Sequence, residues 1–206
     1  RSASSLVLIN DDLSGMLAAV ASGRTIYKNL KNAIGYIITI DLPLISIVTL
    51  PLLLGWKFPE LFTPIHVIFL ELLMGPTCSI VFENEPAHGN EMHEPPRKST
   101  VSLFTWQELS YSLLQGAIIG GIILSMVYVA IQQGYNENIC RTLAFTALVI
   151  SNMLLTLTGR SDSMPFLESL KRKNKLVPII LSITTLLLII LLTVPAAMNL
   201  FGFELP

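Results

Sequence analysis

Five long apolar stretches constrain this chain more than any other feature of its sequence. They run at about residues 33–55, 61–82, 109–132, 138–158 and 176–194. The hydrocarbon core of a bilayer is about 30 Å thick, and a helix needs about 20 apolar residues to cross it. Because a backbone in lipid must satisfy its own hydrogen bonds, and because these stretches are continuous rather than alternating, they predict helices. The expected fold class is an all-α polytopic membrane bundle.

The composition agrees with a membrane location. Of the 206 residues, 52% are hydrophobic and only 13% are charged, whereas soluble domains average about 25% charged residues. The net charge of −1 gives no sign of nucleic-acid binding, and the sequence has no basic block with interleaved aromatic residues. The expected partner is therefore the lipid bilayer, and no nucleic-acid partner is expected.

The basic residues predict the orientation of the chain in the membrane. Loops on the cytoplasmic side of membrane proteins are enriched in Lys and Arg. With the N-terminal segment in the cytoplasm, only Lys57 and Arg141 of the 13 basic residues lie on the far side. The opposite orientation would invert this ratio, so we expect a cytoplasmic N-terminal segment.

Residues 1–32 have a different character. The run from Leu6 to Ile9 ends in an acidic turn, which is a strand-then-turn signal. Asp12 or Ser14 is placed to cap a helix through Val20, and a second helix from about Thr25 is expected to continue into the first span. We therefore divide the chain into residues 1–24, the α/β end of a cytoplasmic domain, and residues 25–206, a stalk with the membrane spans.

Asp41 is the first candidate site residue. It lies about 8 residues into the first span, which places it about 12 Å deep. Pro43 should free the carbonyl of Thr39, and a carboxylate beside a free carbonyl is a plausible ligand set for a hard cation. The alternative is a kinked helix whose Asp41 pairs with a neighbouring Lys, Arg or Ser.

Glu71 is the second candidate, and it lies in the next span at a comparable depth of about 16 Å. Gly75 and Pro76 are expected to break the helix and release the carbonyl of Leu72, as in the broken helices that build ion sites in transporters. Thr77 adds a hydroxyl nearby. Acidic residues at membrane depth usually mark an ion path, so we assign Asp41 and Glu71 as the metal ligands and Thr77 as a further cation-binding residue.

Other polar residues are weaker candidates. Asn152 in the fourth span is a possible cation ligand, although an amide in a membrane helix more often bonds to a neighbouring helix. The loop that contains Glu83, Glu85 and His93 is expected to be solvated. Three glycines in the third span predict a face for close helix packing: Gly116, Gly120 and Gly121.

Two parts of the sequence carry a resemblance to a known family. Residues 4–34, with their strand, acidic turn, Ala-Ala-Val helix and the motif Gly23-Arg24-x-Ile26-Tyr27-x-Asn29, resemble the end of the phosphorylation domain of P-type ATPases. The segment Met92-His93-Glu94-Pro95-Pro96-Arg97 is similar to the Met-x-x-Pro-Pro-Arg loop of the calcium-pump-like branch. The resemblance implies that the five spans are helices five to nine of such a pump, with the tenth missing.

The resemblance also implies roles for the candidate residues. Asp41 and Glu71 stand where calcium pumps have Asn ligands, and Asn152 stands where helix eight supplies a Glu. Three positions carry no oxygen ligand where the family has Glu, Thr and Asp, namely Leu44, Met74 and Gly75.

If the resemblance holds, the function is that of the membrane part of an ATP-driven cation pump, with Ca²⁺ as a possible cargo. ATP and Mg²⁺ would bind in other domains of the same pump, which are expected partners, so no catalytic residue is assigned in this chain. The expected location is a bacterial plasma membrane. Two alternatives remain at this point: a secondary transporter that uses Asp41 and Glu71 as a proton-coupled pair, and a structural membrane domain that transports nothing.

Overall fold

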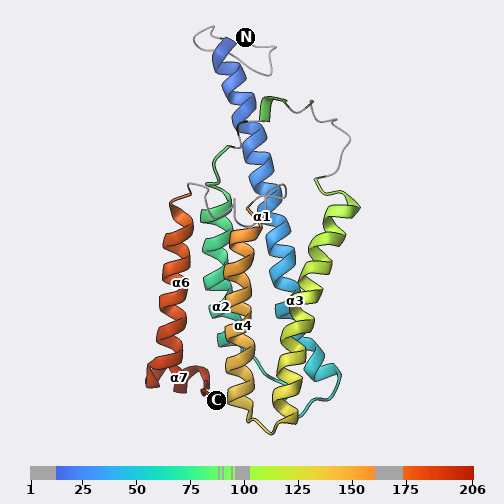
Figure 1. The fold of residues 1–206 in the computed structure, drawn as a ribbon, viewed down its shortest axis with the longest axis vertical. Coiled ribbons are helices and arrows are strands. Elements are labelled where there is room, and N and C mark those ends of the chain that lie inside the picture. Colours follow the sequence, from blue (N-terminus) through green and yellow to red (C-terminus); the bar gives the residue numbers. More distant parts are fainter. Residues whose placement is uncertain (1–12, 88, 90, 94, 96–102, 161–173) are drawn as a thin grey trace.

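The computed structural model describes residues 13–87, 89, 91–93, 95, 103–160 and 174–206, and these residues form an all-helical bundle. Five of its helical segments are long and apolar enough to cross a membrane. Successive segments run in alternating directions, so the chain passes up and down through the bundle (Figure 1). The predicted fold class is therefore confirmed for the membrane part.

The first helix, α1, is a single element of 41 residues, Leu13–Leu53. At about 1.5 Å per residue it is about 60 Å long, which is twice the thickness of a hydrocarbon core. Its first half projects beyond the other long helices (Figure 1). We call residues 13–32 the stalk, and we call the end of the bundle from which they project the stalk end.

The prediction for residues 1–32 is only partly confirmed. Two helices were expected, one ending near Val20 and one starting near Thr25, but the structure has one continuous helix across both. This difference has a simple cause, since Ser22 and Gly23 are weak helix formers that do not prevent a helix from continuing. The predicted strand at residues 6–9 lies outside the described residues, and the part that is described contains no strand.

The second span changes its helix type part of the way along. The α-helix α2, Pro64–Pro76, passes directly into a π-helix, η1, at Thr77–Phe82. The sequence predicted a break at Gly75–Pro76, and the α-helix does end at Pro76, but the chain continues as a π-helix and does not unwind. Pro76 removes one N–H donor, and the wider π-helical turn absorbs this loss while the helical path continues.

The remaining long helices match their predicted spans within about three residues, which is the usual error of such predictions. They are α3 at Trp106–Gln132, α4 at Glu137–Thr158 and α6 at Leu176–Thr193. Side chains cap two of them, because Thr105 accepts a hydrogen bond from the backbone N–H of Glu108, and Asn136 accepts one from Ile139. A short 3₁₀-helix, η2, lies at Glu91–His93, and a last helix, α7, at Pro195–Phe201.

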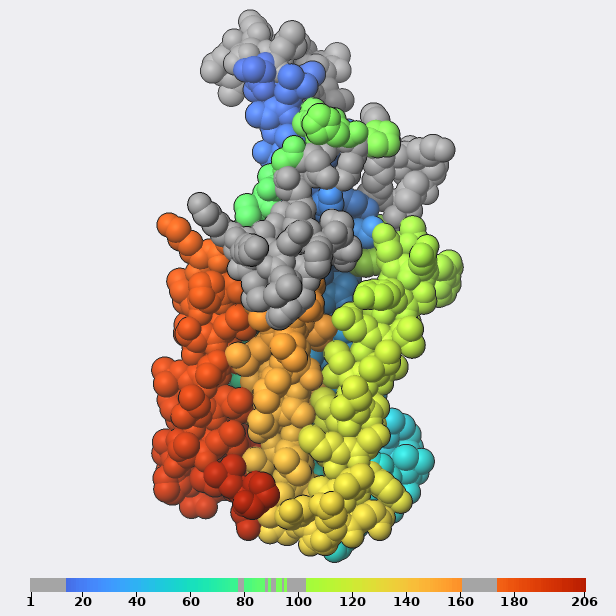
Figure 2. Space-filling view, viewed as in Figure 1, coloured from blue at the N-terminus to red at the C-terminus, as the bar shows by residue number. Residues whose placement is uncertain are grey.

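The helix α4 is the centre of the bundle. Half of its 22 residues are buried, and it lies between α6 and α3 on the face that Figure 2 shows. By contrast, α6 has little buried surface and presents Ile179, Ile183 and Leu186 outward. Such exposed aliphatic side chains suit a helix that faces lipid.

The contact between α1 and α3 depends on two of the three glycines that were predicted to pack closely. A Cβ atom at Gly120 would lie 3.3 Å from the Cα of Pro43, and one at Gly116 would lie 2.7 Å from the carbonyl oxygen of Thr39. Gly121 has no such neighbour within 4 Å. The packing prediction is therefore confirmed for Gly116 and Gly120 and is wrong for Gly121, which lies on another face of the helix.

Candidate cation site

Asp41 lies on α1 and is half-buried. The helix continues through Pro43 without interruption. The carbonyl of Thr39, which Pro43 leaves without an N–H donor, faces Gly116 of α3. Thr39 and Asp41 are two residues apart, which places them on nearly opposite sides of the helix. The Thr39 carbonyl therefore belongs to the packing contact with α3 and is not part of the surroundings of the Asp41 carboxylate.

Glu71 lies on α2 and is exposed at the surface of the described chain. Its neighbours Ile68 and Leu72 are also exposed, at 68% and 64% of their full surface. These three residues share one side of the helix because they are spaced by one, three and four positions. The carboxylate of Glu71 thus stands on a face of α2 that is otherwise apolar.

The carboxylates of Asp41 on α1 and Glu71 on α2 lie near enough for their two negative charges to repel each other. Two carboxylates supply at most four oxygen ligands, whereas Ca²⁺ takes six to eight. Among the described residues no group of three or more His, Cys, Asp and Glu side chains converges on one point. Within the described residues, these two carboxylates alone therefore leave the coordination of such a cation incomplete.

Asn152 lies in the interior, with 2% of its surface exposed. Its side-chain oxygen accepts a hydrogen bond from the hydroxyl of Tyr36 on α1. The ring of Tyr36 in turn packs against Phe82 of η1, with the ring centroids 5.0 Å apart. In this arrangement Asn152 joins α4 to α1, which is the role that amides in membrane helices often have.

Thr77, the first residue of η1, is also buried. Its hydroxyl donates to the carbonyl of Leu73 in α2, at 3.5 Å. The oxygens of Asn152 and Thr77 are thus bonded within the protein, whereas the two carboxylates lie closer to the surface.

A cavity between three of the helices does not contain the carboxylates. It has a volume of about 740 Å³ and is lined by residues of α1, α3 and α4, including Lys31, Tyr36 and Glu108. Lys31 and Glu108 form an ion pair there, which links the stalk to the start of α3. Neither Asp41 nor Glu71 lines this cavity.

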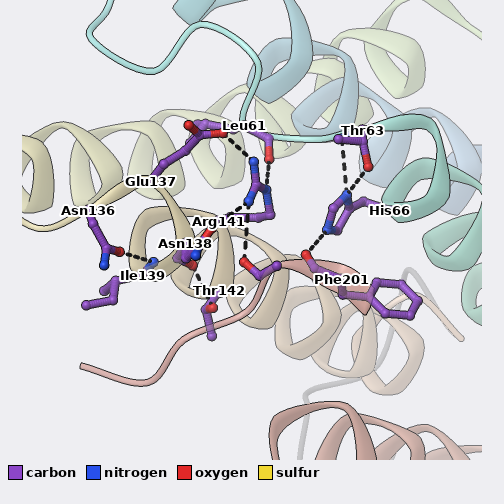
Figure 3. A network of polar contacts seen from close by, with 11 residues as sticks. Leu61, Thr63, His66, Asn136, Glu137, Asn138, Ile139, Arg141, Thr142 and Phe201 are labelled. Carbon is purple, nitrogen blue, oxygen red and sulfur yellow. Dashed lines mark hydrogen bonds and ion pairs between the residues drawn. The ribbon is translucent and has the colours of Figure 1, made fainter. Parts of the chain in front are cut away.

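Figure 3 shows a polar network at the end of the bundle opposite the stalk. Arg141 of α4 is mostly buried and donates to the carbonyls of Leu61, at 2.6 Å, and Gly202, at 3.3 Å. It also forms an ion pair with Glu137. The sequence placed Arg141 on the far side of the membrane, but it did not indicate that this residue would hold two chain segments together.

His66 is the second centre of this network. It is almost fully buried, with its ring among Phe62, Phe145, Phe201 and Phe203. The carbonyl of Phe201 can only accept, so Nε2 of His66 donates to it at 2.7 Å. Nδ1 then accepts from the backbone N–H of Thr63 at 3.1 Å. His66 therefore caps α2 and also holds the end of α7.

One further correction concerns Glu85. The loop around it was expected to be solvated, but Glu85 is 3% exposed and forms an ion pair with Arg160, which is 2% exposed. A single sequence carries little signal for such a contact, because the partners are separated by 75 residues.

The model of a family described as "Cation transporting ATPase, C-terminus" matches residues 59–206. The chain is also similar to curated proteins. It is 29% identical over 177 residues to calcium-transporting ATPase 1 of Lactococcus lactis, covering 86% of this chain and 20% of that protein.

Two other relatives show how wide this similarity is. Calcium-transporting ATPase 1 of Bacillus cereus is 26% identical over 219 residues, which cover 98% of this chain and 24% of the relative. An endoplasmic reticulum-type calcium-transporting ATPase of Arabidopsis thaliana is 34% identical over 121 residues, or 58% of this chain and 11% of the relative. The matched region is thus a quarter or less of the length of each of these relatives.

Proposed function

This chain belongs to the cation-transporting ATPase family, in its C-terminal part, and from that premise we propose that it works as the membrane part of an ATP-driven cation pump. In this role it supplies part of the intramembrane cation site and the stalk that couples this site to ATP hydrolysis. The observation that carries the proposal is the presence of two acidic residues, Asp41 and Glu71, on separate membrane-spanning helices, near enough for their like charges to repel each other.

Asp41 and Glu71 are the proposed cation ligands of this chain. Their position near the surface of the described bundle leaves room for further ligands from the rest of the pump. Asn152 and Thr77 are proposed as additional ligands. Asn152 would have to release Tyr36 before its oxygen binds a cation, because that oxygen now accepts the Tyr36 hydroxyl.

Calcium is the first cargo to test, because the curated relatives are calcium-transporting ATPases. A hard dication with oxygen ligands also suits a pair of carboxylates. Leu44, Met74 and Gly75 offer no side-chain oxygen, so the ligand set of this chain differs from that of the calcium pumps that it resembles.

The other domains of the intact pump are proposed to bind ATP and Mg²⁺ and to accept the phosphoryl group. We place the N-terminal segment, and therefore the stalk, in the cytoplasm, following the distribution of basic residues. We propose a bacterial plasma membrane because several of the relatives are bacterial. The 41-residue helix supports this proposal, because one rigid element reaches from the stalk to Asp41. A secondary transporter has no need of such a stalk.

The test uses the full-length protein that contains this chain, reconstituted in vesicles. ATP hydrolysis and cation uptake are measured with calcium, manganese, magnesium and potassium and with a proton gradient. We expect one of these cations to stimulate hydrolysis and to accumulate in the vesicles. Hydrolysis that responds to none of them, or a cation that moves without ATP, would contradict the proposal.

A further inference from the structure

A buried ion pair lies at the stalk end of the bundle. Arg160 donates from Nε and Nη2 to the two carboxylate oxygens of Glu85, each at 2.9 Å. Glu85 follows the end of η1 by three residues, and Arg160 follows the end of α4 by two. The side chains are 1% and 2% exposed. This bidentate geometry is the strong and directional form of an Arg–carboxylate contact.

Asn174 brings a third helix to the pair. Its side-chain amide donates to Glu85 Oε2 at 2.9 Å and to the carbonyl of Val81 in η1 at 3.2 Å. Its side-chain oxygen accepts from the backbone N–H of Leu176 at the start of α6. The ends of η1 and α4 and the beginning of α6 are therefore joined through one carboxylate.

The stalk is bonded to both members of the pair through their backbone. Asn29 donates to the carbonyl of Glu85 at 2.8 Å and to that of Glu83 at 3.3 Å. Asn32, one turn further along α1, donates to the carbonyl of Arg160 at 3.2 Å. Figure 1 shows the upper ends of α2 and α4 close to α1 at this level. Asn29 is itself buried, and its bond to the carbonyl of Glu85 is shielded from water.

We propose that Glu85 and Arg160 are positioning residues that fix the stalk to the helix carrying Glu71 and to α4, so that movement of the stalk reaches the cation site. This inference rests on the proposed function. A buried ion pair is weak evidence for stability, because an apolar replacement often serves as well. Its value here is geometric, since it holds four chain segments in one arrangement through short and directional bonds.

A role in transmitting movement and a purely structural role predict different numbers of ions moved for each ATP hydrolysed. If the pair only stabilises the fold, a folded variant without it should move as many ions for each ATP hydrolysed as the wild type. If the pair transmits movement, such a variant should still bind the cation and hydrolyse ATP, but it should move fewer ions. The ratio of uptake to hydrolysis is therefore the informative measurement.

Two variants of the full-length protein test the two links. The first variant combines Glu85→Gln with Arg160→Gln and removes the ion pair without leaving a lone buried charge. The second combines Asn29→Ala with Asn32→Ala and removes the stalk bonds while the ion pair stays. Glu137→Gln combined with Arg141→Gln is the matched control, because it also removes a whole Glu–Arg pair, at the end of the bundle away from the stalk. Calcium is the probe, in sealed vesicles, with hydrolysis and uptake measured on the same sample.

We expect both double variants to keep the half-saturating calcium concentration of the wild type and to lose about fivefold in calcium moved per ATP, the size of a modest coupling between sites. The control should keep the wild-type ratio. A wild-type ratio in either folded double variant overturns the proposal. If the wild type itself shows no hydrolysis that depends on calcium or the other cations tested, the proposed function fails and this inference fails with it. Unchanged ratios in an active pump remove this inference alone.

Discussion

The backbone of Gly116 on α3 lies so close to the carbonyl oxygen of Thr39 on α1 that a Cβ atom at position 116 would stand 2.7 Å from that oxygen. Neither this Cβ atom nor the carbonyl oxygen is the end of a flexible side chain, so the helices would have to move apart to remove the clash. Gly116→Ala should therefore destabilise the protein by about 1–3 kcal/mol, as overpacking does. Thermal unfolding of the purified protein in detergent measures this loss.

Gly121 on the same helix provides the matched control. A Cβ atom there meets nothing within 4 Å, and Ala is the better helix former by about 1 kcal/mol. Gly121→Ala should leave the unfolding temperature unchanged or raise it. Equal effects at positions 116 and 121 would show that helix propensity, and not the contact with Thr39, controls the outcome.

Replacing the carboxylates tests the cation site itself. Asp41→Asn and Glu71→Gln each remove a negative charge while keeping the size of the side chain. Each should raise the half-saturating cation concentration for ATP hydrolysis at least tenfold, or about 1.4 kcal/mol in binding free energy. The activity of the full-length protein, titrated with the stimulating cation, provides the measurement.

Glu60→Gln is the control for this pair, because Glu60 is exposed in the segment between α1 and α2. The same chemical change there should leave the titration as it is in the wild type. If the variants at positions 41 and 71 also titrate like the wild type, then neither carboxylate binds the transported cation.

The sequence predicted the five spans because each depends on a local property, the length of an apolar stretch. It also placed Asp41 and Glu71 at similar depths, because depth follows from position along a helix. It could not predict the π-helix after Pro76. A proline indicates which hydrogen bond is lost, but the packing of η1 on its neighbours decides how the backbone responds.

The buried polar contacts could not be predicted from the sequence, for a related reason. Glu85 and Arg160 are far apart in the chain, and so are Tyr36 and Asn152. Each pair depends on how far one helix is rotated and shifted against another. A single sequence indicates which face of a helix is apolar, but it does not fix this register. Glu85 therefore had the pattern of a solvated loop residue although it lies in the interior.

The Tyr36–Asn152 contact gives a third prediction. Tyr36→Phe removes the hydroxyl and leaves the oxygen of Asn152 without that donor, which should lower stability by about 1–3 kcal/mol. Asn152→Ala, alone and combined with Tyr36→Phe, completes a double-mutant cycle in thermal unfolding. The combined loss should be smaller than the sum of the single losses, because both changes remove the same bond.

The same variants test Asn152 as a cation ligand. If it binds the cation, Asn152→Ala should weaken cation-stimulated hydrolysis, whereas Tyr36→Phe should not, because the amide oxygen remains in place. If both variants keep the cation affinity of the wild type, Asn152 has the single role of joining α4 to α1.

Arg141 gives the last prediction, at the end of the bundle away from the stalk. Arg141→Met keeps a long apolar stem but removes every donor to the carbonyls of Leu61 and Gly202. It also leaves Glu137 without its partner. The loss should be about 1–3 kcal/mol, because the carbonyls lose a charged donor, while the half-exposed Glu137 carboxylate stays in contact with water. Hydrogen exchange should rise most around residues 201–204.

Lys57→Met is the control, since Lys57 is exposed and contacts the ring of Phe58 at 5.2 Å, a contact worth about 0.5–1 kcal/mol. If both variants raise exchange equally in this segment, the bonds of Arg141 do not hold the end of α7 in place.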